Sequence, residues 1–457
     1  MANYTVQTPC GALQGTSCQW PGVAAYKGIR YATAGRWEYP RVVTHWDGVY
    51  DATAYGACCY QTRAFQDEAK GNSFYYIEFR KDEQYTYSED CLFLNVWTPE
   101  NAKPGDQLPV LLYIHGGAFM GGCGHEKHFD GPVWPTKGVI GVTINYRLGP
   151  LGFACLPELA EEAGHTGNYG LYDQLAALEW VRGNIAAFGG DPEKITIMGQ
   201  SAGAMSVQQL CLSPLAKDKF VAAVMSSGGG IGPFSETAPA EDSYAFWQNV
   251  SRHAGCADLD ALRALPVEQL FGAFFAAMSE QKTQGLPAAP VIDGAFIPRA
   301  PAETAAAGGQ AHVPYLIGST SHDMMPPMLL QMSREWSLLQ ARQGGPAAYT
   351  WHFDRMLPGD DAGAWHSSDL WYWFGTLDHC WRPFTEKDHV LSGQMVGYLA
   401  NFVKTGNPNG DGLPEWLPNA EGQNEVLRIG EGETRMGDVD IAYLTEIMKK
   451  YKAEGER

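Results

Sequence analysis

The stretch that decides the fold is Ile195-Thr196-Ile197-Met198-Gly199-Gln200-Ser201-Ala202-Gly203-Ala204, a strand pattern that runs through Gly-x-Ser-x-Gly into an apolar helical pattern. A tight turn between strand and helix leaves no room for side chains two positions either side of the serine, which explains Gly199 and Gly203. The turn holds Ser201 at the start of a helix, whose positive end favours developing negative charge. The stretch therefore predicts a nucleophilic serine on an α/β fold.

A second glycine-rich stretch, Tyr113-Ile114-His115-Gly116-Gly117-Ala118-Phe119, closes another strand pattern. Small residues let the backbone approach a substrate carbonyl, so we expect the N–H groups of Gly117, Ala118 and Ala202 to form an oxyanion hole. The alternative is a glycine-rich turn needed only for chain reversal. Because His115 lies inside the turn that presents these amides, we interpret it as a structural partner of the loop and not as a base.

Short β-branched or apolar runs recur along the chain and predict buried strands at 108–114, 139–146, 195–198, 220–225 and 313–317. Between two of these runs, apolar residues at 171, 175, 178, 181, 185 and 188 mark one face of a helix over 170–188. The sequence Gly189-Gly190-Asp191-Pro192 should stop that helix. Strands that alternate with helices imply a mostly parallel sheet covered on both faces.

The chain has 457 residues, and no linker divides it, so we expect one domain over 1–457. From 232 to 309 the strand signal fades, and Ala-rich, Pro-interrupted helical patterns replace it. We interpret this stretch as a helical insertion over the active site. Ligands bind beyond the carboxyl ends of the strands in such sheets, so an insertion there could shape a substrate pocket.

The charge balance excludes one class of partner. Lysine and arginine total 32 and the acids total 51, so the net charge is 32 − 51 = −19, and a nucleic acid would be repelled. No segment approaches the roughly 20 apolar residues that cross a bilayer. The N-terminus has neither a basic nor an apolar run, which favours the cytoplasm, with secretion left as the alternative if a signal was removed.

The ten cysteines form no C-x-x-C pair and no metal-like spacing, so we expect mostly buried thiols and no metal. One pair is separated far enough to close a loop as a disulfide, namely Cys91 with either Cys58 or Cys59. A reducing cytoplasm disfavours that bond.

A serine hydroxyl needs a base to take its proton, and histidine titrates near the working pH. In α/β-hydrolases the chain order is nucleophile, acid, histidine, so the base should lie well downstream of Ser201. Spacing alone does not choose among the histidines that remain, which are His253, His312, His322, His352, His366, His379 and His389.

Several further strings resemble signatures of the type-B carboxylesterase and cholinesterase family, densely from about residue 10 to 230 and more thinly afterwards. They are Glu89-Asp90-Cys91-Leu92-Phe93-Leu94-Asn95-Val96-Trp97, Asn145-Tyr146-Arg147-Leu148-Gly149-Pro150-Leu151-Gly152-Phe153, Gly167-Asn168-Tyr169-Gly170-Leu171-Tyr172-Asp173-Gln174 and Phe188-Gly189-Gly190-Asp191-Pro192. The resemblance implies an α/β-hydrolase fold, with a large, mostly parallel sheet and helices on both faces.

The resemblance also assigns the remaining site residues. His366-Ser367-Ser368-Asp369 is similar to the family segment headed by the catalytic histidine, which implies that His366 is the base. The family's acid follows a strand ending in Ile-Gly and is usually Glu; Asp323 occupies that position here, so the shorter carboxylate departs from the pattern. Ser227 resembles a family serine near the triad and is expected to hold the acid in place, although a turn serine is the alternative.

These residues together predict a serine carboxylesterase that hydrolyses uncharged carboxylic esters through an acyl-enzyme, with no cofactor and a small-molecule ester as its partner. Gln200 stands where cholinesterases carry an acid, which argues against a cationic choline ester. The alternatives are a feruloyl, acetyl or carbamate-cleaving esterase, or a non-catalytic cholinesterase-like binding module. The oligomeric state does not follow from the sequence.

Overall fold

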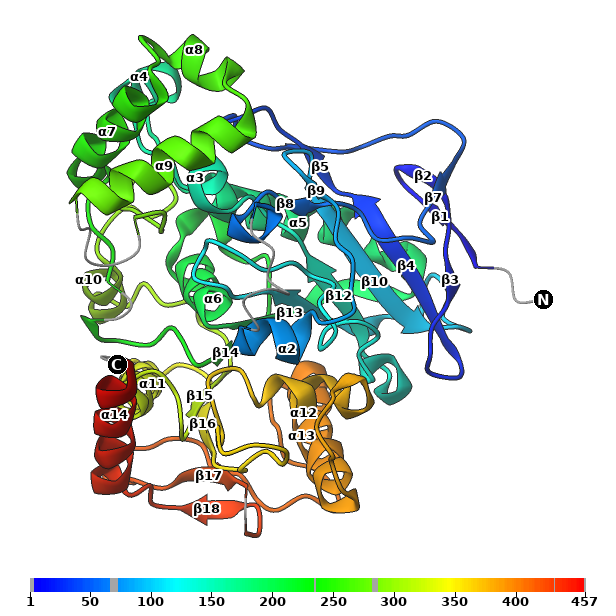
Figure 1. Ribbon diagram of the computed structural model, residues 1–457. Coiled ribbons are helices and arrows are strands. Elements are labelled where there is room, and N and C mark those ends of the chain that lie inside the picture. The colour runs from blue at the N-terminus through cyan, green and yellow to red at the C-terminus, as the bar shows by residue number, and fades with distance from the viewer. Residues whose placement is uncertain (1–3, 66–72, 234–235, 282–286, 431, 456–457) are drawn as a thin grey trace.

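The computed structural model describes residues 4–65, 73–233, 236–281, 287–430 and 432–455, which build a large sheet between layers of helices (Figure 1). In this described part, the sheet has 11 strands. In spatial order they are β18 (Arg435–Gly437), β17 (Val426–Ile429), β16 (Ala348–Phe353), β15 (Tyr315–Thr320), β14 (Ala222–Ser226), β13 (Gly190–Gln200), β11 (Leu108–Ile114), β12 (Ile140–Ile144), β10 (Phe93–Pro99), β4 (Val23–Arg30) and β3 (Thr16–Ser17).

The strands from β17 to β12 pair in parallel, whereas the pairs at both edges are antiparallel. All five predicted strands are confirmed, as β11, β12, β13, β14 and β15. Their bounds shift by a few residues, and β13 begins five residues earlier than its apolar run because Gly190 already pairs with Leu108 of β11. The core of the fold is therefore the parallel sheet that the sequence predicts.

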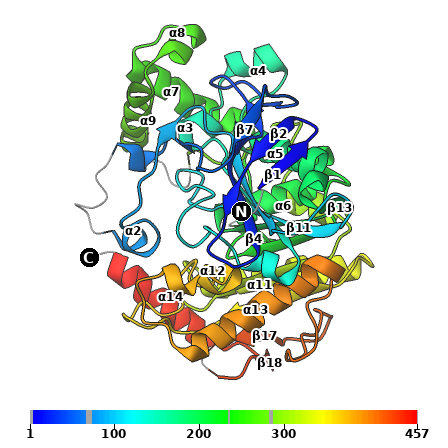
Figure 2. The same cartoon turned by 90° about the vertical axis from the view of Figure 1, so that its right-hand side faces the viewer.

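Two apolar cores lie on the two faces of this sheet. Along β11, Val110, Leu112 and Ile114 belong to one core, while Leu111 and Tyr113 belong to the other, as the alternation of side chains in a strand requires. Helices α5 (Tyr169–Asn184) and α6 (Ala202–Leu212) cover the first face, and α12 (Leu370–Phe374) and α13 (Glu386–Thr405) cover the second (Figure 2).

The helix predicted over 170–188 is confirmed with one change near its end. The α-helix α5 runs to Asn184, and a 3₁₀ turn, Ile185–Phe188, continues it. Gly189 then adopts φ 88°, the left-handed conformation that commonly ends a helix. The next residues, 190–192, already belong to β13, so the stop is supplied by Gly189.

The stretch 232–309 contains several helices, apart from 234–235 and 282–286, which lie outside the described residues. It contains α7 (Tyr244–Ala254), α8 (Leu259–Ala264), α9 (Val267–Gln281) and α10 (Pro301–Ala306). Helices α7, α8 and α9 gather beside α3 (Gly149–Gly152) and α4 (Pro157–Ala163) at the end of the molecule opposite β17 and β18 (Figures 1 and 2).

Smaller elements surround the main sheet. One small sheet joins β1 (Thr5–Thr8), β2 (Gly11–Gln14) and β7 (Val49–Asp51), and two-stranded pairs join β5 (Ala32–Thr33) to β6 (Arg41–Val42) and β8 (Cys58–Cys59) to β9 (Tyr87–Ser88). The other helices are α2 (Phe74–Phe79), α11 (Pro326–Arg342) and α14 (Ile441–Gly455). None of the described helices combines the length and apolar character needed to cross a bilayer.

The ten cysteines are all free thiols, and most of them are buried, as expected. Cys91 interacts with Cys59, one of its two predicted partners, but the two thiols are not bonded.

Candidate active site

Ser201 is the single residue between the end of β13 and the start of α6, and its backbone conformation is strained. Its φ of 57° and ψ of −126° are uncommon for a residue with a side chain. The Ser201 N–H donates to the Ser226 carbonyl of the neighbouring strand at 2.8 Å, which fixes the turn against the sheet. The side chain is half-buried and faces a cavity.

The two flanking glycines are required by close backbone contacts. A Cβ atom added to Gly199 would lie inside 3.0 Å of the Gly203 carbonyl, and one added to Gly203 would lie inside 3.0 Å of the Ile114 carbonyl in β11. The crowding expected on either side of the serine is therefore confirmed. Ser201 is presented by a turn that no larger residue could complete.

His366 and Asp323 are joined by a short hydrogen bond. His366 Nδ1 lies 2.6 Å from Asp323 Oδ1, and both side chains are buried. Asp323 follows β15 and also accepts hydrogen bonds from the Met324 N–H at 2.8 Å and the Thr320 hydroxyl at 3.1 Å. These bonds fix the carboxylate, which in turn orients the imidazole.

Burial and the charge of the partner shift the pKa values of His366 and Asp323 in opposite directions. Burial disfavours the imidazolium, but the Asp323 carboxylate outweighs it, so the pKa of His366 is raised above its usual value. Burial also disfavours the carboxylate, but His366 and the donated hydrogen bonds outweigh that effect and lower the pKa of Asp323. Asp323 is thus charged at neutral pH, as an orienting acid must be.

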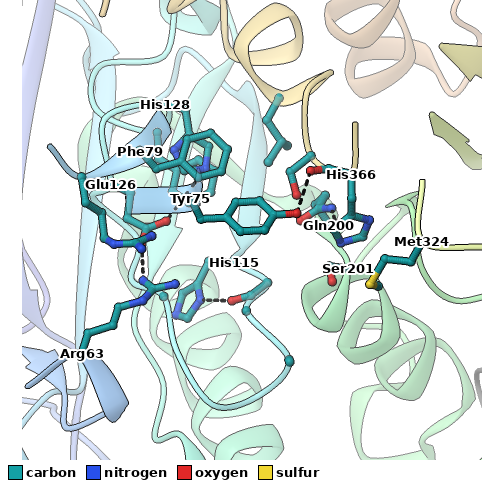
Figure 3. A pocket seen from close by; sticks show the side chains of 18 residues that line it. Arg63, Tyr75, Phe79, His115, Glu126, His128, Gln200, Ser201, Met324 and His366 are labelled. Carbon is teal, nitrogen blue, oxygen red and sulfur yellow. Dashed lines mark hydrogen bonds and ion pairs between the residues drawn. The ribbon is translucent and has the colours of Figure 1, made fainter. Parts of the chain in front are cut away.

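Gln200 occupies the position next to the other imidazole nitrogen. Its Nε2 lies 3.1 Å from His366 Nε2, so with the His366 Nδ1 proton donated to Asp323 the Gln200 amide donates to Nε2. Ser201 and His366 face the same cavity (Figure 3). Among the described contacts, however, Nε2 bonds Gln200 and not the Ser201 hydroxyl.

The predicted oxyanion-hole residues lie around Ser201. Gly117 and Ala118 have φ values of 109° and 55°, and within the described residues their N–H groups donate to no backbone carbonyl. Ala202 supplies the first N–H of α6, one of the donors that a helix leaves unsatisfied. The neighbouring Gly116 comes so close that an added Cβ would lie 3.0 Å from the Ser201 Cβ.

His115 and Ser227 lie where the sequence places them, beside the loop and beside the acid. The His115 ring is buried, contacts the Gly116 carbonyl through Nδ1 at 2.8 Å and stacks on Tyr146, all of which fits a structural partner of the loop. The Ser227 hydroxyl lies close enough to lower the pKa of Asp323, but it makes no hydrogen bond of good geometry. Its supporting role stays a prediction.

A cavity of about 210 Å³ opens in front of Ser201. One wall is aromatic, with Tyr75 and Phe79 from α2, and Tyr75 donates its hydroxyl to the His366 carbonyl at 3.3 Å (Figure 3). No residue of 232–309 lines this cavity among those described; α2 supplies the covering helix instead.

The far end of the cavity is charged, which the sequence did not predict. Glu126 is buried there, 2.5 Å from Arg63 and 3.6 Å from Arg80. Burial would raise the pKa of Glu126, but the two guanidinium groups lower it to about 2. No spacing signals this cluster, because Arg63 and Glu126 are far apart in the chain and meet only in the folded molecule.

Asp369, three residues after His366, carries a second buried carboxyl group. It accepts hydrogen bonds from the Ser226 hydroxyl at 2.9 Å and the Trp373 indole at 3.1 Å, and burial raises its pKa to about 6. The sequence placed this acid in the His-x-x-acid segment but gave no sign of its environment.

Comparison with known proteins finds relatives in both sequence and fold. The model of the carboxylesterase family matches residues 2–338 and 324–447. Para-nitrobenzyl esterase of Bacillus subtilis (strain 168) is 39% identical over 327 residues, which are 70% of this chain but 63% of that protein. Mouse (Mus musculus) carboxylesterase 1E is 29% identical over 94% of this chain and 90% of its own. A solved thermophilic PNB esterase superposes with a TM-score of 0.82 at 29% identity, covering 94% of this chain and 96% of its own.

Proposed function

The chain belongs to the carboxylesterase family and is a serine hydrolase of carboxylic ester bonds, and from that premise we propose that Ser201, His366 and Asp323 carry out the reaction. The observation that carries the assignment is the His366 Nδ1 to Asp323 Oδ1 contact of 2.6 Å, in a cavity that also holds Ser201. The non-catalytic alternative is not favoured, because the similar proteins compared above are esterases and the serine is present.

The proposed reaction has two steps. His366 Nε2 takes the proton of the Ser201 hydroxyl while the Ser201 Oγ bonds to the ester carbonyl carbon. The resulting imidazolium gives that proton to the leaving alkoxide, and the acyl group stays on Ser201. Water then attacks the acyl-enzyme with His366 as base, which releases the carboxylic acid and restores the serine.

The carbonyl oxygen becomes negative at each attack. The N–H groups of Gly117, Ala118 and Ala202 are proposed to hold it, since they lie around Ser201 and are not used by the backbone. Their fixed positions mean that little reorganisation is needed when the charge develops.

The hydrogen bond from the Gln200 amide to His366 Nε2 has to break before the first proton transfer. The single lone pair of Nε2 can accept a hydrogen bond from Gln200 or from Ser201, but not from both. We propose that the resting enzyme holds its base through Gln200 and that substrate entry releases it.

The preferred substrate is proposed to be a small, uncharged ester. The cavity of about 210 Å³ is smaller than the roughly 300–1,000 Å³ typical of sites for drug-sized ligands. Among the described residues that line it, the one acid is Glu126, which is paired with Arg63 and Arg80, and Gln200 is uncharged. Within this described lining, a quaternary ammonium group would therefore meet no unpaired carboxylate.

The substrate proposal is tested with two thioesters of matched shape, butyrylthiocholine and its neutral 3,3-dimethylbutyl counterpart. We expect the neutral ester to have the higher kcat/KM by at least about tenfold, a ratio that corresponds to roughly 1.4 kcal/mol. Gln200→Glu should narrow this gap by favouring the cation. A wild-type preference for the cationic ester would contradict the proposal.

A further inference from the structure

Three metal-ligand side chains meet outside the candidate active site. The Cys58 and Cys123 sulfurs and a ring nitrogen of His125 all lie within 4.8 Å of one another, and no other such group of three was found among the described residues. We propose that Cys58, Cys123 and His125 bind a thiophilic divalent metal ion of the zinc type.

The spacing of the ligand atoms fits a tetrahedral ion. Bonds of about 2.3 Å from zinc to sulfur and about 2.0–2.1 Å to nitrogen place sulfur and nitrogen roughly 3.6 Å apart in a tetrahedron, and two sulfurs roughly 3.8 Å apart. The Cys58 sulfur lies 3.6 Å from His125 Nε2. The 4.8 Å limit on all three separations leaves only small side-chain rotations to complete the site.

The two cysteines are held by rigid backbone. Cys58 belongs to β8, and its N–H donates to the Thr86 carbonyl at 2.8 Å. Cys123 lies between Gly122 and Gly124, whose N–H groups donate to buried side-chain amide oxygens at 2.9 and 2.8 Å. Both thiols are buried, so the pair is pre-organised on separate segments of the chain.

The third ligand, His125, is held in place by ring stacking. His125 stacks on Tyr55, with ring centroids 4.5 Å apart and planes 8° from parallel. Its ring also lines a polar cavity of about 410 Å³, together with Glu83, Lys127 and Asp130. Cys58 and Cys123 do not line this cavity, so a water that completes the site as a fourth ligand would approach from the His125 side.

Charge also favours a metal at this buried position. Two thiolates and a neutral imidazole around a divalent cation carry no net charge, whereas a buried bare thiolate would be costly. Thiolate sulfur and imidazole nitrogen are the ligands that zinc prefers over harder cations such as magnesium. A Cys58–Cys123 disulfide is the competing outcome, and it would leave His125 without a role.

Metal binding would tie β8 to the loop beside the nucleophile. Cys123 directly follows Gly122, which lines the cavity that holds Ser201. The loop that carries Gly117 and Ala118 would thus be cross-linked to β8, and the fold should melt at a higher temperature with the ion bound.

The test uses the full chain purified under reducing conditions. Its zinc content is measured by mass spectrometry, and the chain is then stripped and titrated with Co²⁺, whose sulfur-to-metal charge-transfer absorption reports thiolate ligands. We expect one ion per chain and a thiolate band. Cys123→Ala and His125→Phe should lose or weaken both signals, while Cys155→Ala, another buried cysteine outside the cluster, should retain them.

His125→Phe keeps a ring that can stack on Tyr55, so it isolates the loss of the nitrogen ligand even if Cys123→Ala fails to fold. The proposal is overturned if the reduced wild type binds neither zinc nor cobalt, or if Cys123→Ala binds cobalt with an unchanged band. It is also overturned if the chain purified without reductant holds a Cys58–Cys123 disulfide and its reduced form takes up no metal.

Discussion

The reactivity of Ser201 depends on three residues, and its position is set by the backbone. A positive φ at a serine costs free energy, and here the Ser226 carbonyl bonds the Ser201 N–H and holds the turn. The base is oriented from its far nitrogen by Asp323 and is occupied at its near nitrogen by Gln200. The site therefore rests with its hydrogen bonds satisfied and needs only one exchange to begin the reaction.

Removal of the nucleophile or the acid separates their roles. Ser201→Ala should lower kcat by about 10⁶, and Asp323→Asn by roughly 10⁴, because the serine forms the bond while the acid orients the base. The rates are measured with a p-nitrophenyl ester, and melting temperatures control for folding. Near-normal turnover of Asp323→Asn would point to another carboxylate, such as Asp369, as the acid.

Among the elements, β13 and α6 meet at a junction where the backbone is closely packed. The first turn of α6 lies against the Ile114 carbonyl at the end of β11, and this close approach is possible because Gly203 has no side chain. The same contact brings the oxyanion loop, which follows β11, to the nucleophile. This one junction thus positions both the nucleophile and the proposed oxyanion hole.

Two Gly→Ala changes test this junction. Gly203→Ala should destabilise the fold by more than about 1–3 kcal/mol, because the new methyl group meets backbone that cannot move aside. Gly183→Ala, on the exposed side of α5 with open space around it, should stabilise by about 0.5–1 kcal/mol. Melting temperatures check both changes. Equal effects would show that the junction is not crowded.

Asp369 is the residue just before helix α12, and its buried carboxyl makes the stability of the fold depend on pH. Its pKa of about 6 in the fold lies above the unfolded value of about 3.9, so the folded state binds more protons between these limits. The contribution of this group to the free energy of unfolding is therefore fully present below about pH 4 and is lost as the pH rises through about 6.

Asp369→Asn removes that loss, since an amide stays neutral and still accepts from Ser226 and Trp373. We expect the variant to be more stable than wild type at pH 8, on the order of 2 kcal/mol, and to lose most of this advantage toward pH 4. Thermal unfolding at several pH values checks this, with Asp411→Asn as an exposed control. A variant less stable at pH 8 would contradict it.

Across the whole molecule, one buried ion pair connects segments that belong to different layers. Arg147, after β12, bonds both carboxylate oxygens of Asp173 in α5 at 2.7 and 2.8 Å, and both side chains are buried. The pair joins the end of a central strand to a helix that covers the sheet.

Asp173→Asn should cost about 3–5 kcal/mol, because it leaves the Arg147 guanidinium buried without its counter-charge. Glu193→Gln breaks an exposed pair with Arg182 and should change stability by less than about 1 kcal/mol. Melting temperatures of the two variants are compared with wild type. A loss of similar size in both would show that burial does not decide the effect.

The sequence predicted what depends on local pattern. The five central strands, the helix after residue 168 and the serine turn follow from apolar periodicity and from glycine sterics, which act over a few residues. His366 and Asp323 needed a family resemblance, because a histidine and an acid far along the chain carry no local signal of their meeting. The strands that extend the sheet from these five to its two edges, β3, β4, β10, β16, β17 and β18, were not predicted, since tertiary pairing decides them.

Tertiary structure alone decided the contacts between distant residues. Folding brings Gln200 to the base, Glu126 to two arginines, and Cys58 and Cys123 to His125, although these residues are ordinary in sequence. The sequence by itself determined a nucleophilic serine on an α/β sheet. Only the fold decided the surroundings of that serine, because burial and electrostatic coupling depend on distance in space and not on separation along the chain.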